Sequence, residues 1–411
     1  MLQHAFARLG NMPQFAALRH RGFRLLWFAT LLSSTARWAD MVVIGWLTLE
    51  LTNSPLWVGI VAGSKMAGYF AAPFMGVIAD RMDRRMLMIV AAIVNLGVSI
   101  VMLALFALDW LALWHVISLA FVSSLTWSLD HPTRQALMPD LVGKNDLTNA
   151  IALNAVAIEI TVVIGPALGG LLIPAFGMTG AYALIAVIYL VDLAVLFALK
   201  PVKQSVPKAQ ESPGRSMIEG LKYVRSNRTV LMLLVLAGLL NLLAAPYRYA
   251  FLPVFARDVL NAGPAGYGML TAAAGVGALV AGVWVVSLGN IEGKGRLLIW
   301  NCFAWSLSLV FFAASTWYYA SVVLIFLAGL AQAICWTFIA TLILGHTSQA
   351  MRGRVMGIRA GVVVSLPIGN FVGGAVAEHA GAPWAQGIYG IASLVMMIVI
   401  VAMAPELKRL K

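Results

Sequence analysis

The sequence predicts an all-α membrane protein with twelve transmembrane helices in two six-helix bundles. Three observations lead to this fold class. The 411 residues are 61% hydrophobic and only 11% charged, whereas soluble proteins carry about 25% charged residues. The apolar residues come in runs of about 20, the length of helix that crosses a bilayer. One long polar interruption divides these runs into six and six.

The spans are the apolar runs bounded by charged residues, proline or glycine. They are predicted at residues 23–49, 56–79, 86–108, 110–130, 148–175, 178–199, 229–254, 265–288, 296–314, 317–343, 355–378 and 384–404. The domains that follow are an N-terminal segment over 1–22, a first bundle over 23–199, a linker over 200–228, a second bundle over 229–404 and a tail over 405–411.

The linker is basic, and its apolar residues are spaced as on one face of a helix. Met217, Ile218, Leu221 and Val224 recur three or four residues apart. A helix with one apolar face and basic residues on the other is typical of a segment lying in the membrane surface. We therefore expect an amphipathic helix within the linker.

The excess of positive charge defines the orientation of the chain. The formal net charge is +12, and nearly all of the 28 lysines and arginines fall on alternate loops. Such loops stay in the cytoplasm, so both termini are predicted to be cytoplasmic and the chain to cross the inner (plasma) membrane many times. The charge then reflects topology, and no nucleic-acid partner is expected. Cys302 and Cys335 lie in apolar runs, so no disulfide framework or metal site is expected.

Two features suggest that the halves are related and move against each other. Residues 164–170 (IGPALGG) resemble 368–374 (IGNFVGG), which indicates an internal repeat. Small residues also recur every fourth position, a spacing that lets membrane helices approach closely. These ridges are Gly59, Gly63, Ala67 and Ala71; Gly361, Ser365, Gly369, Gly373 and Ala377; Ala157, Thr161, Gly165 and Gly169; and Ala274, Ala278 and Gly282. They are interpreted as sliding surfaces, with ordinary helix packing as the alternative.

Two motifs resemble those of the major facilitator superfamily. Residues 76–85 (GVIADRMDRR) match its loop motif G-x-x-x-D-R-x-G-R-R except at Asp83, and 165–170 (GPALGG) resemble the helix 5 motif of its antiporters. Thr161 stands where that motif has its first glycine. The run from Asp130 to Ala150 and residues 352–356 (RGRVM) look like the siderophore- and macrolide-efflux branch.

The resemblance implies a fold and a mechanism. The fold is two pseudo-symmetric bundles in which helices 2 and 11, and helices 5 and 8, meet across the halves. The activity is secondary active transport by rocking these bundles around a central site, with no cofactor and no metal. The helix 5 residues expected at the interface are Gly165, Pro166, Gly169 and Gly170.

A cytoplasmic gate is expected near the loop motif. Asp80 lies where the second helix leaves the membrane, and the N-terminus of the eleventh helix offers a positive dipole end on which it could dock. Arg84 is then expected to pair with Asp130. The alternative is a set of solvated charges that determine topology. The predicted gate residues are Gly76, Asp80, Arg81, Arg84, Arg85, Asp130, Arg134, Arg352 and Arg354.

Charges inside the apolar spans are candidates for proton coupling, because an ionisable residue at mid-membrane usually faces a partner or a cavity. The candidates are Asp40, Glu159, Arg37, Lys65 and Arg248. Lys65 and Glu159 point away from the small-residue ridges, so a structural Lys65–Glu159 pair is an alternative. Arg37 and Asp40 lie three apart and could pair.

Among the carboxylates, Asp40 is the first candidate, since helix 1 lines the cavity in the resembled fold, and Glu159 is the second. Asp192 is expected to be peripheral and to satisfy a neighbour such as Asn95. The substrate surface is expected to be apolar and aromatic with a few polar groups, and its candidate residues are Asn241, Tyr247, Phe251, Gln332 and Trp336.

The predicted function is a proton-coupled exporter, an antiporter, of amphipathic small molecules such as siderophores or drugs. Its partners are the substrate, protons and membrane lipids, and a monomer is expected. A lysophospholipid or lipid transporter of the same fold is the alternative. An enzyme is disfavoured because no P-loop, H-E-x-x-H or G-x-S-x-G motif occurs, and a sensor is disfavoured because no soluble domain is present.

Overall fold

The computed structural model describes residues 13–71, 75, 82–201, 213–287 and 292–410. All regular secondary structure within these ranges is helical, as predicted. By their contacts the residues divide into two units, Met1–Ile44 with Ala67–Lys208 and Gly45–Met66 with Ala209–Lys411. The stretch Gly45–Met66, predicted within the first bundle, has its contacts in the second unit.

The helices of the first half are long, and one of them contains three predicted spans. The elements are η1 (Pro13–Arg19), α2 (Arg21–Thr52), α3 (Pro55–Ala67), η2 (Gly68–Ala71), α5 (Arg84–Ala107) and α6 (Leu113–Ala198). Helix α6 is interrupted at Gly143 and Gly177, whose φ angles are 72° and 68°. Only glycine adopts this conformation without strain, so these two residues separate the fourth, fifth and sixth spans.

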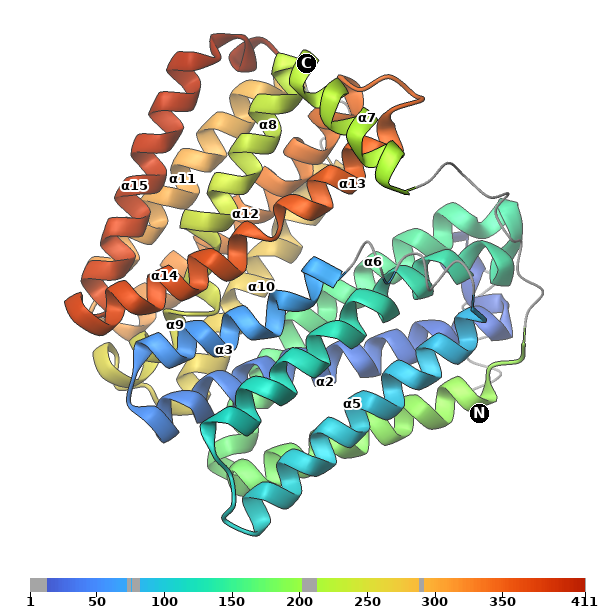
Figure 1. The fold of residues 1–411 in the computed structure, drawn as a ribbon, viewed down its shortest axis with the longest axis vertical. Coiled ribbons are helices and arrows are strands. Elements are labelled where there is room, and N and C mark those ends of the chain that lie inside the picture. The colour runs from blue at the N-terminus through green and yellow to red at the C-terminus, as the bar shows by residue number, and fades with distance from the viewer. Residues whose placement is uncertain (1–12, 72–74, 76–81, 202–212, 288–291, 411) are drawn as a thin grey trace. The chain divides into compact units, whose positions relative to one another are not determined.

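The second half contains a linker helix, α7 (Pro213–Ser226), and six further spans. The elements are α8 (Arg228–Leu239), η3 (Leu240–Ala244), η4 (Ala245–Arg248), α9 (Leu252–Val254), η5 (Phe255–Val259), α10 (Gly263–Ser287), α11 (Lys294–Ala314), α12 (Tyr318–Gly345), α13 (Arg352–Val362), α14 (Ser365–Ala380), α15 (Ala382–Met403) and η6 (Pro405–Arg409). Figure 1 shows α11, α12 and α15 side by side.

The described helices are consistent with twelve spans. Eight stretches, Arg84–Ala107 to Ala382–Met403, are long and apolar enough to cross a membrane. One of these is α6, which contributes three spans, and α2 and α3 precede them. The stretch from α8 to η5 forms one span whose middle departs from α-helical geometry. Pro246 and Pro253 lie there, and a proline removes a hydrogen-bond donor from the helix interior.

The N-terminal segment is tied to the turn between the fourth and fifth spans. The Asp146 carboxylate accepts hydrogen bonds from Arg19 at 2.7 and 2.9 Å and lies 2.7 Å from His20 Nε2. The backbone N–H of Ala17 donates to Asn149 Oδ1 at 2.8 Å. These contacts place η1 against α6 within the first unit.

The linker contains the predicted amphipathic helix, α7. Met217, Ile218 and Leu221 are exposed, whereas Val224 is buried. Glu219 forms an ion pair of 2.9 Å with Arg354, and the Tyr223 hydroxyl accepts a hydrogen bond from Ser348 N at 3.1 Å. The helix is therefore attached to the second unit and presents an exposed apolar face.

Candidate functional site

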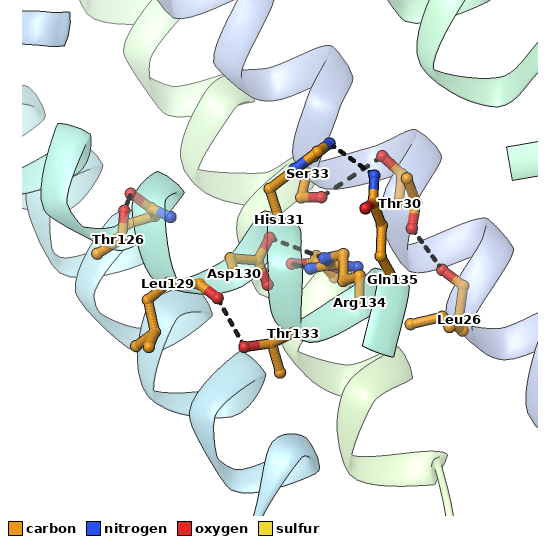
Figure 2. A network of polar contacts seen from close by, with 12 residues as sticks. Leu26, Thr30, Ser33, Thr126, Leu129, Asp130, His131, Thr133, Arg134 and Gln135 are labelled. Atoms are coloured by element: carbon orange, nitrogen blue, oxygen red, sulfur yellow. Dashed lines mark hydrogen bonds and ion pairs between the residues drawn. The ribbon is translucent and has the colours of Figure 1, made fainter. Parts of the chain in front are cut away.

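The first unit contains a buried polar network built around Arg134. Arg134 Nε donates to Asp130 Oδ2 at 2.7 Å, one helical turn away (Figure 2). Asp192, in the sixth span, places Oδ2 3.6 Å from Arg134 Nη2. The side chains of Arg134 and Asp192 are 6% and 1% exposed. One guanidinium is thus shared by two buried carboxylates.

The two carboxylates are held unequally. Asp130 forms a short, charge-assisted hydrogen bond, the strong kind of polar contact. Neither oxygen of Asp192 makes a hydrogen bond within the described residues. Asp192 is therefore held by charge alone, at a longer distance.

Asp40 belongs to the same network through two tyrosines of the sixth span. Its carboxylate interacts electrostatically with Tyr182 and Tyr189, and Tyr189 also interacts with Asp192, Asp130 and Arg37. We call the set Arg37, Asp40, Asp130, Arg134, Tyr182, Tyr189 and Asp192 the unit 1 network. It draws its residues from the first, fourth and sixth spans.

Arg37 rests on an aromatic ring at the edge of this network. Its Cζ lies 3.1 Å from the ring centre of Trp127, a cation–π arrangement. Trp127 in turn donates to the Tyr69 hydroxyl at 3.2 Å and lies 4.7 Å from the His131 ring. Polar groups from the first, second and fourth spans therefore meet around Trp127.

Asp192 is buried, and its expected contact with Asn95 is wrong. The side chain faces Arg134, whereas Asn95 Oδ1 accepts a hydrogen bond from Thr126 at 2.8 Å. A signal was present in the sequence, because Tyr182, Tyr189 and Asp192 fall on one face of a helix.

Lys65 and Glu159 belong to different units. Each has interactions of its own, Glu159 is exposed, and Lys65 is half-buried. A Lys65–Glu159 pair and a coupling role for Glu159 both stay predictions.

The predicted gate residues have mixed outcomes. Gly76, Asp80 and Arg81 lie outside the described residues. The predicted Arg84–Asp130 pair is wrong, because Arg84 Nη1 instead bonds Asp140 Oδ2 at 2.7 Å and the Ala136 carbonyl at 2.9 Å. Asp130 is engaged by Arg134, one turn along its own helix, and this local pair forms more easily than a distant one.

The other basic gate residues are dispersed. Arg85 donates to the Phe197 carbonyl at 3.0 Å, Arg354 pairs with Glu219 in the linker helix, and Arg352 is exposed. Their common role in a gate stays a prediction.

The small-residue ridge of α3 meets α14 inside the second unit. A Cβ added at Gly59 would collide with the Asn370 carbonyl and lie 3.1 Å from Gly374 Cα, and one at Gly63 would lie 3.4 Å from the Pro367 carbonyl. The predicted contact between the second and eleventh spans is therefore present.

The face of α14 that makes this contact differs from the predicted one. Gly369 approaches the Leu242 carbonyl and Pro246, and Gly373 lies 2.8 Å from Phe251 by the same measure. Both glycines pack on the broken seventh span. The contact with α3 is therefore made by the neighbouring face of α14, which carries Pro367, Asn370 and Gly374.

The helix 5 glycines have a partner within the first unit. A Cβ at Gly165 would meet Trp38 and the Thr35 carbonyl, and one at Gly169 would lie 2.5 Å from the Ala39 carbonyl. Pro166 and Gly170 are also buried. In the second unit Gly277 and Gly329 bring α10 and α12 together. Close packing within each unit explains these small residues, and a contact between helices 5 and 8 stays a prediction.

The C-terminal end of α2 and the N-terminal end of α3, predicted to lie on the outer side, are held by residues of the second half. Glu378 Oε2 accepts hydrogen bonds from the Ser54 hydroxyl at 2.7 Å and from Leu56 N at 3.2 Å. Arg257 Nη1 donates to the Leu49 carbonyl at 2.9 Å and to Asn53 Oδ1 at 2.8 Å. We call these contacts the outer clasp.

Two of the predicted substrate residues meet in the second unit. The Tyr247 hydroxyl donates to Gln332 Oε1 at 3.2 Å, which joins the seventh and tenth spans. Tyr247 and Phe251 are fully buried, and Asn241 and Arg248 nearly so. Trp336 packs edge-on against Trp305 at 6.2 Å. Most of the predicted substrate residues are thus buried inside the second unit in this conformation. Their contact with substrate stays a prediction.

Comparison with known proteins is consistent with this architecture. A family model described as transmembrane secretion effector matches residues 12–410. The enterobactin exporter EntS of Shigella boydii serotype 18 is 26% identical over 370 residues, 89% of this chain and 84% of that protein. EntS of Escherichia coli O1:K1 has the same identity and coverage.

Two solved transporters share the fold at low sequence identity. The nucleoside transporter NupG has a TM-score of 0.76 at 12% identity, covering 93% of this chain and 99% of its own. A POT family transporter in complex with 5-aminolevulinic acid has a TM-score of 0.77 at 11% identity, covering 94% and 96%.

Proposed function

Because the chain belongs to the transmembrane secretion effector family of the major facilitator superfamily, we propose that it exports amphipathic small molecules, such as siderophores, in exchange for protons. The chain is a multi-pass membrane transporter and not an enzyme. The siderophore class is supported by relatives named as enterobactin exporters. Proton exchange is supported by one observation, the carboxylates of the unit 1 network around Arg134.

Asp40 is the proposed coupling carboxylate and Glu159 the second candidate. Asp40 lies within a network that also contains two guanidinium groups and two tyrosines. A proton on such a carboxylate changes which partners the neighbouring arginines prefer. In an exporter, inward proton movement supplies the energy, since one charge crossing the membrane potential releases about 2.3 kcal/mol per 100 mV.

Alternating access would require the outer clasp to break. Gly45–Met66 is continuous with α2, yet its contacts lie in the second unit. A rocking motion that opens the outer side would separate α3 from α14 and release Glu378 from Ser54. The small residues at Gly59 and Gly374 fit a surface that separates and re-forms without interlocked side chains.

The proposed location is the inner membrane, with both termini in the cytoplasm and the chain acting as a monomer. This orientation follows from the basic loops.

The test is a proteoliposome assay with an imposed pH gradient. Siderophores, drugs and lysophospholipids are offered separately, and proton movement is recorded with a pH-sensitive dye inside the vesicles. We expect a siderophore to drive proton movement, with loss of at least about tenfold in Asp40→Asn, equivalent to 1.4 kcal/mol. Asp109→Asn, an exposed acid at a turn, is the matched control.

Two results would contradict the proposal. Proton movement that survives Asp40→Asn and Glu159→Gln together would overturn the coupling assignment. Transport of lysophospholipids alone would favour the lipid-transport alternative.

A further inference from the structure

We propose that Asp192 is a second proton-binding residue of this transporter, sharing Arg134 with Asp130 and exchanging a proton as Arg134 shifts between them. Its part in transport rests on the proposed function, whereas proton binding itself does not. Three features of the first unit support this proposal. Asp192 is buried, its carboxylate oxygens accept no hydrogen bond within the described residues, and the network contains more carboxylates than guanidiniums.

The charge balance leaves one carboxylate in excess. The unit 1 network contains three carboxylates, Asp40, Asp130 and Asp192, and two guanidiniums, Arg37 and Arg134. With the carboxylates and guanidiniums ionised and the tyrosines neutral, the network would carry one net negative charge. A net charge within the apolar part of a membrane is costly, so the network favours binding one proton.

Of the two carboxylates around Arg134, Asp192 fits a proton better than Asp130. Asp130 accepts a 2.7 Å hydrogen bond from Arg134 at Oδ2, although its Oδ1 accepts none within the described residues. Asp192 is 1% exposed, lies 3.6 Å from Arg134, and neither of its oxygens has a hydrogen bond within the described part of the chain. A buried carboxylate without hydrogen bonds is stabilised by taking up a proton.

Among the described residues, Arg134 is the cation that pairs with Asp192. The charged and titratable groups with which Asp192 itself interacts are Arg134 and Asp130 from the fourth span and Tyr189 from its own span. Asp40 and Arg37 from the first span interact with Tyr189, and His131 interacts with Asp130 and Arg134. Of the basic residues at the start of α5, Arg84 pairs with Asp140 and Arg85 donates to the Phe197 carbonyl. Arg37 lies over Trp127, so Arg134 is the cation that Asp192 shares.

The proton step is a simple exchange. An O–H bond forms between an Asp192 oxygen and a proton from water, and the carboxylate charge is lost. Arg134 is then left with Asp130 as its single ionised partner. When the proton leaves, Arg134 is again shared by two carboxylates, which places opposing pulls on the fourth and sixth spans.

The test is infrared spectroscopy of the full chain reconstituted in lipid, recorded as a function of pH without substrate. We expect a carboxylic-acid band that titrates in the wild type and is smaller by one carboxyl group in Asp192→Asn. At neutral pH the matched control Asp109→Asn should retain the full band.

A second variant tests the same site if Asp192→Asn does not fold. In Asp130→Asn, Arg134 no longer pairs with Asp130 and can pair fully with Asp192. The positive charge of Arg134 then stabilises the ionised form of Asp192, so Asp192 should give up its proton. The carboxylic-acid band should therefore be weaker than in the wild type at the same pH.

Two outcomes would overturn the inference. A band of unchanged size in Asp192→Asn would show that Asp192 stays ionised as a structural partner of Arg134. A stronger or unchanged band in Asp130→Asn would show that Arg134 is not shared. Because no transport is measured, these outcomes are distinct from failure of the proposed export activity.

Discussion

Glu378 accepts a hydrogen bond from the Ser54 hydroxyl at 2.7 Å and another from Leu56 N at 3.2 Å. A carboxylate of α14 thus caps the N-terminus of α3, where unpaired N–H groups and the helix dipole favour negative charge. The sequence analysis predicts the same kind of contact at the cytoplasmic side, with Asp80 docking on the eleventh helix. The structure describes such a contact at the opposite end of the same two helices.

Removing the charge of Glu378 should loosen α3. In Glu378→Gln the loss of a charge at a helix N-terminus costs roughly 0.5–1 kcal/mol, so amides of residues 45–66 should exchange with deuterium roughly 2- to 5-fold faster. Hydrogen-exchange mass spectrometry measures this. The control is Glu50→Gln, since Glu50 accepts a hydrogen bond within α2, from Trp46. Equal exchange in both variants would show that the cap does not hold α3.

The close approach of α3 and α14 should not tolerate an added methyl group. Gly59→Ala would push a Cβ into the Asn370 carbonyl, and overpacking costs about 1–3 kcal/mol. We expect a lower melting temperature in detergent and reduced transport. Gly97→Ala in α5 is the matched control, because no described atom lies within 4 Å of its added Cβ. If both variants melt as the wild type does, the contact is looser than described.

The buried Arg84–Asp140 pair should be more sensitive to single changes than to a double change. The two side chains are 10% and 9% exposed, and removing one partner of a buried pair costs about 3–5 kcal/mol because the other charge is left uncompensated. Asp140→Asn should therefore destabilise the protein strongly.

In the double variant Arg84→Gln with Asp140→Asn, neither charge of the pair remains, so part of the loss in stability should be regained. Thermal unfolding of the two single variants and the double variant gives the coupling energy. Additive losses would mean that the two residues act independently.

Much of the fold could be predicted from the sequence, because membrane spans follow from apolar length and loop charge. The linker helix follows likewise from the spacing of Met217, Ile218 and Leu221. The predictions failed where a residue had a choice of polar partners. Arg84 pairs with Asp140 and not Asp130, because Asp130 is bound by Arg134 one turn away. Which polar side chains pair depends on how each helix is rotated about its axis and how deep each residue lies in the membrane. The spacing of apolar residues does not specify either.

The same reason explains the wrong partner expected for Asp192. In the sequence it is an isolated acid on a helix assumed to be peripheral. Its significance depends on the approach of Arg134, 58 positions earlier in the chain. The packing partner of the helix 5 glycines could not be predicted either. A small-residue ridge indicates that another helix approaches closely, but it does not identify that helix.

The attachment of the N-terminal segment should depend on the charge of Asp146. Hydrogen bonds from His20 and Arg19 hold the pKa of this carboxyl below its ordinary value of 3.8. Because the folded pKa is lowered, the stabilisation is fully present above the ordinary value and is lost as the pH falls through the lowered one. The contribution of the Asp146 charge should therefore be constant across the neutral range and be lost only in strong acid.

A nitroxide on Ala16→Cys reports the attachment, since Ala16 precedes the bonded Ala17 N–H and the native cysteines are buried. The label should be immobile at neutral pH and gain mobility only in strong acid. Asp146→Asn should make it mobile at neutral pH, because a neutral amide weakens the contacts with Arg19 and His20. Asp109→Asn is the control. A label equally immobile in Asp146→Asn would mean that Asn149 and the apolar contacts of η1 hold the segment without the carboxylate.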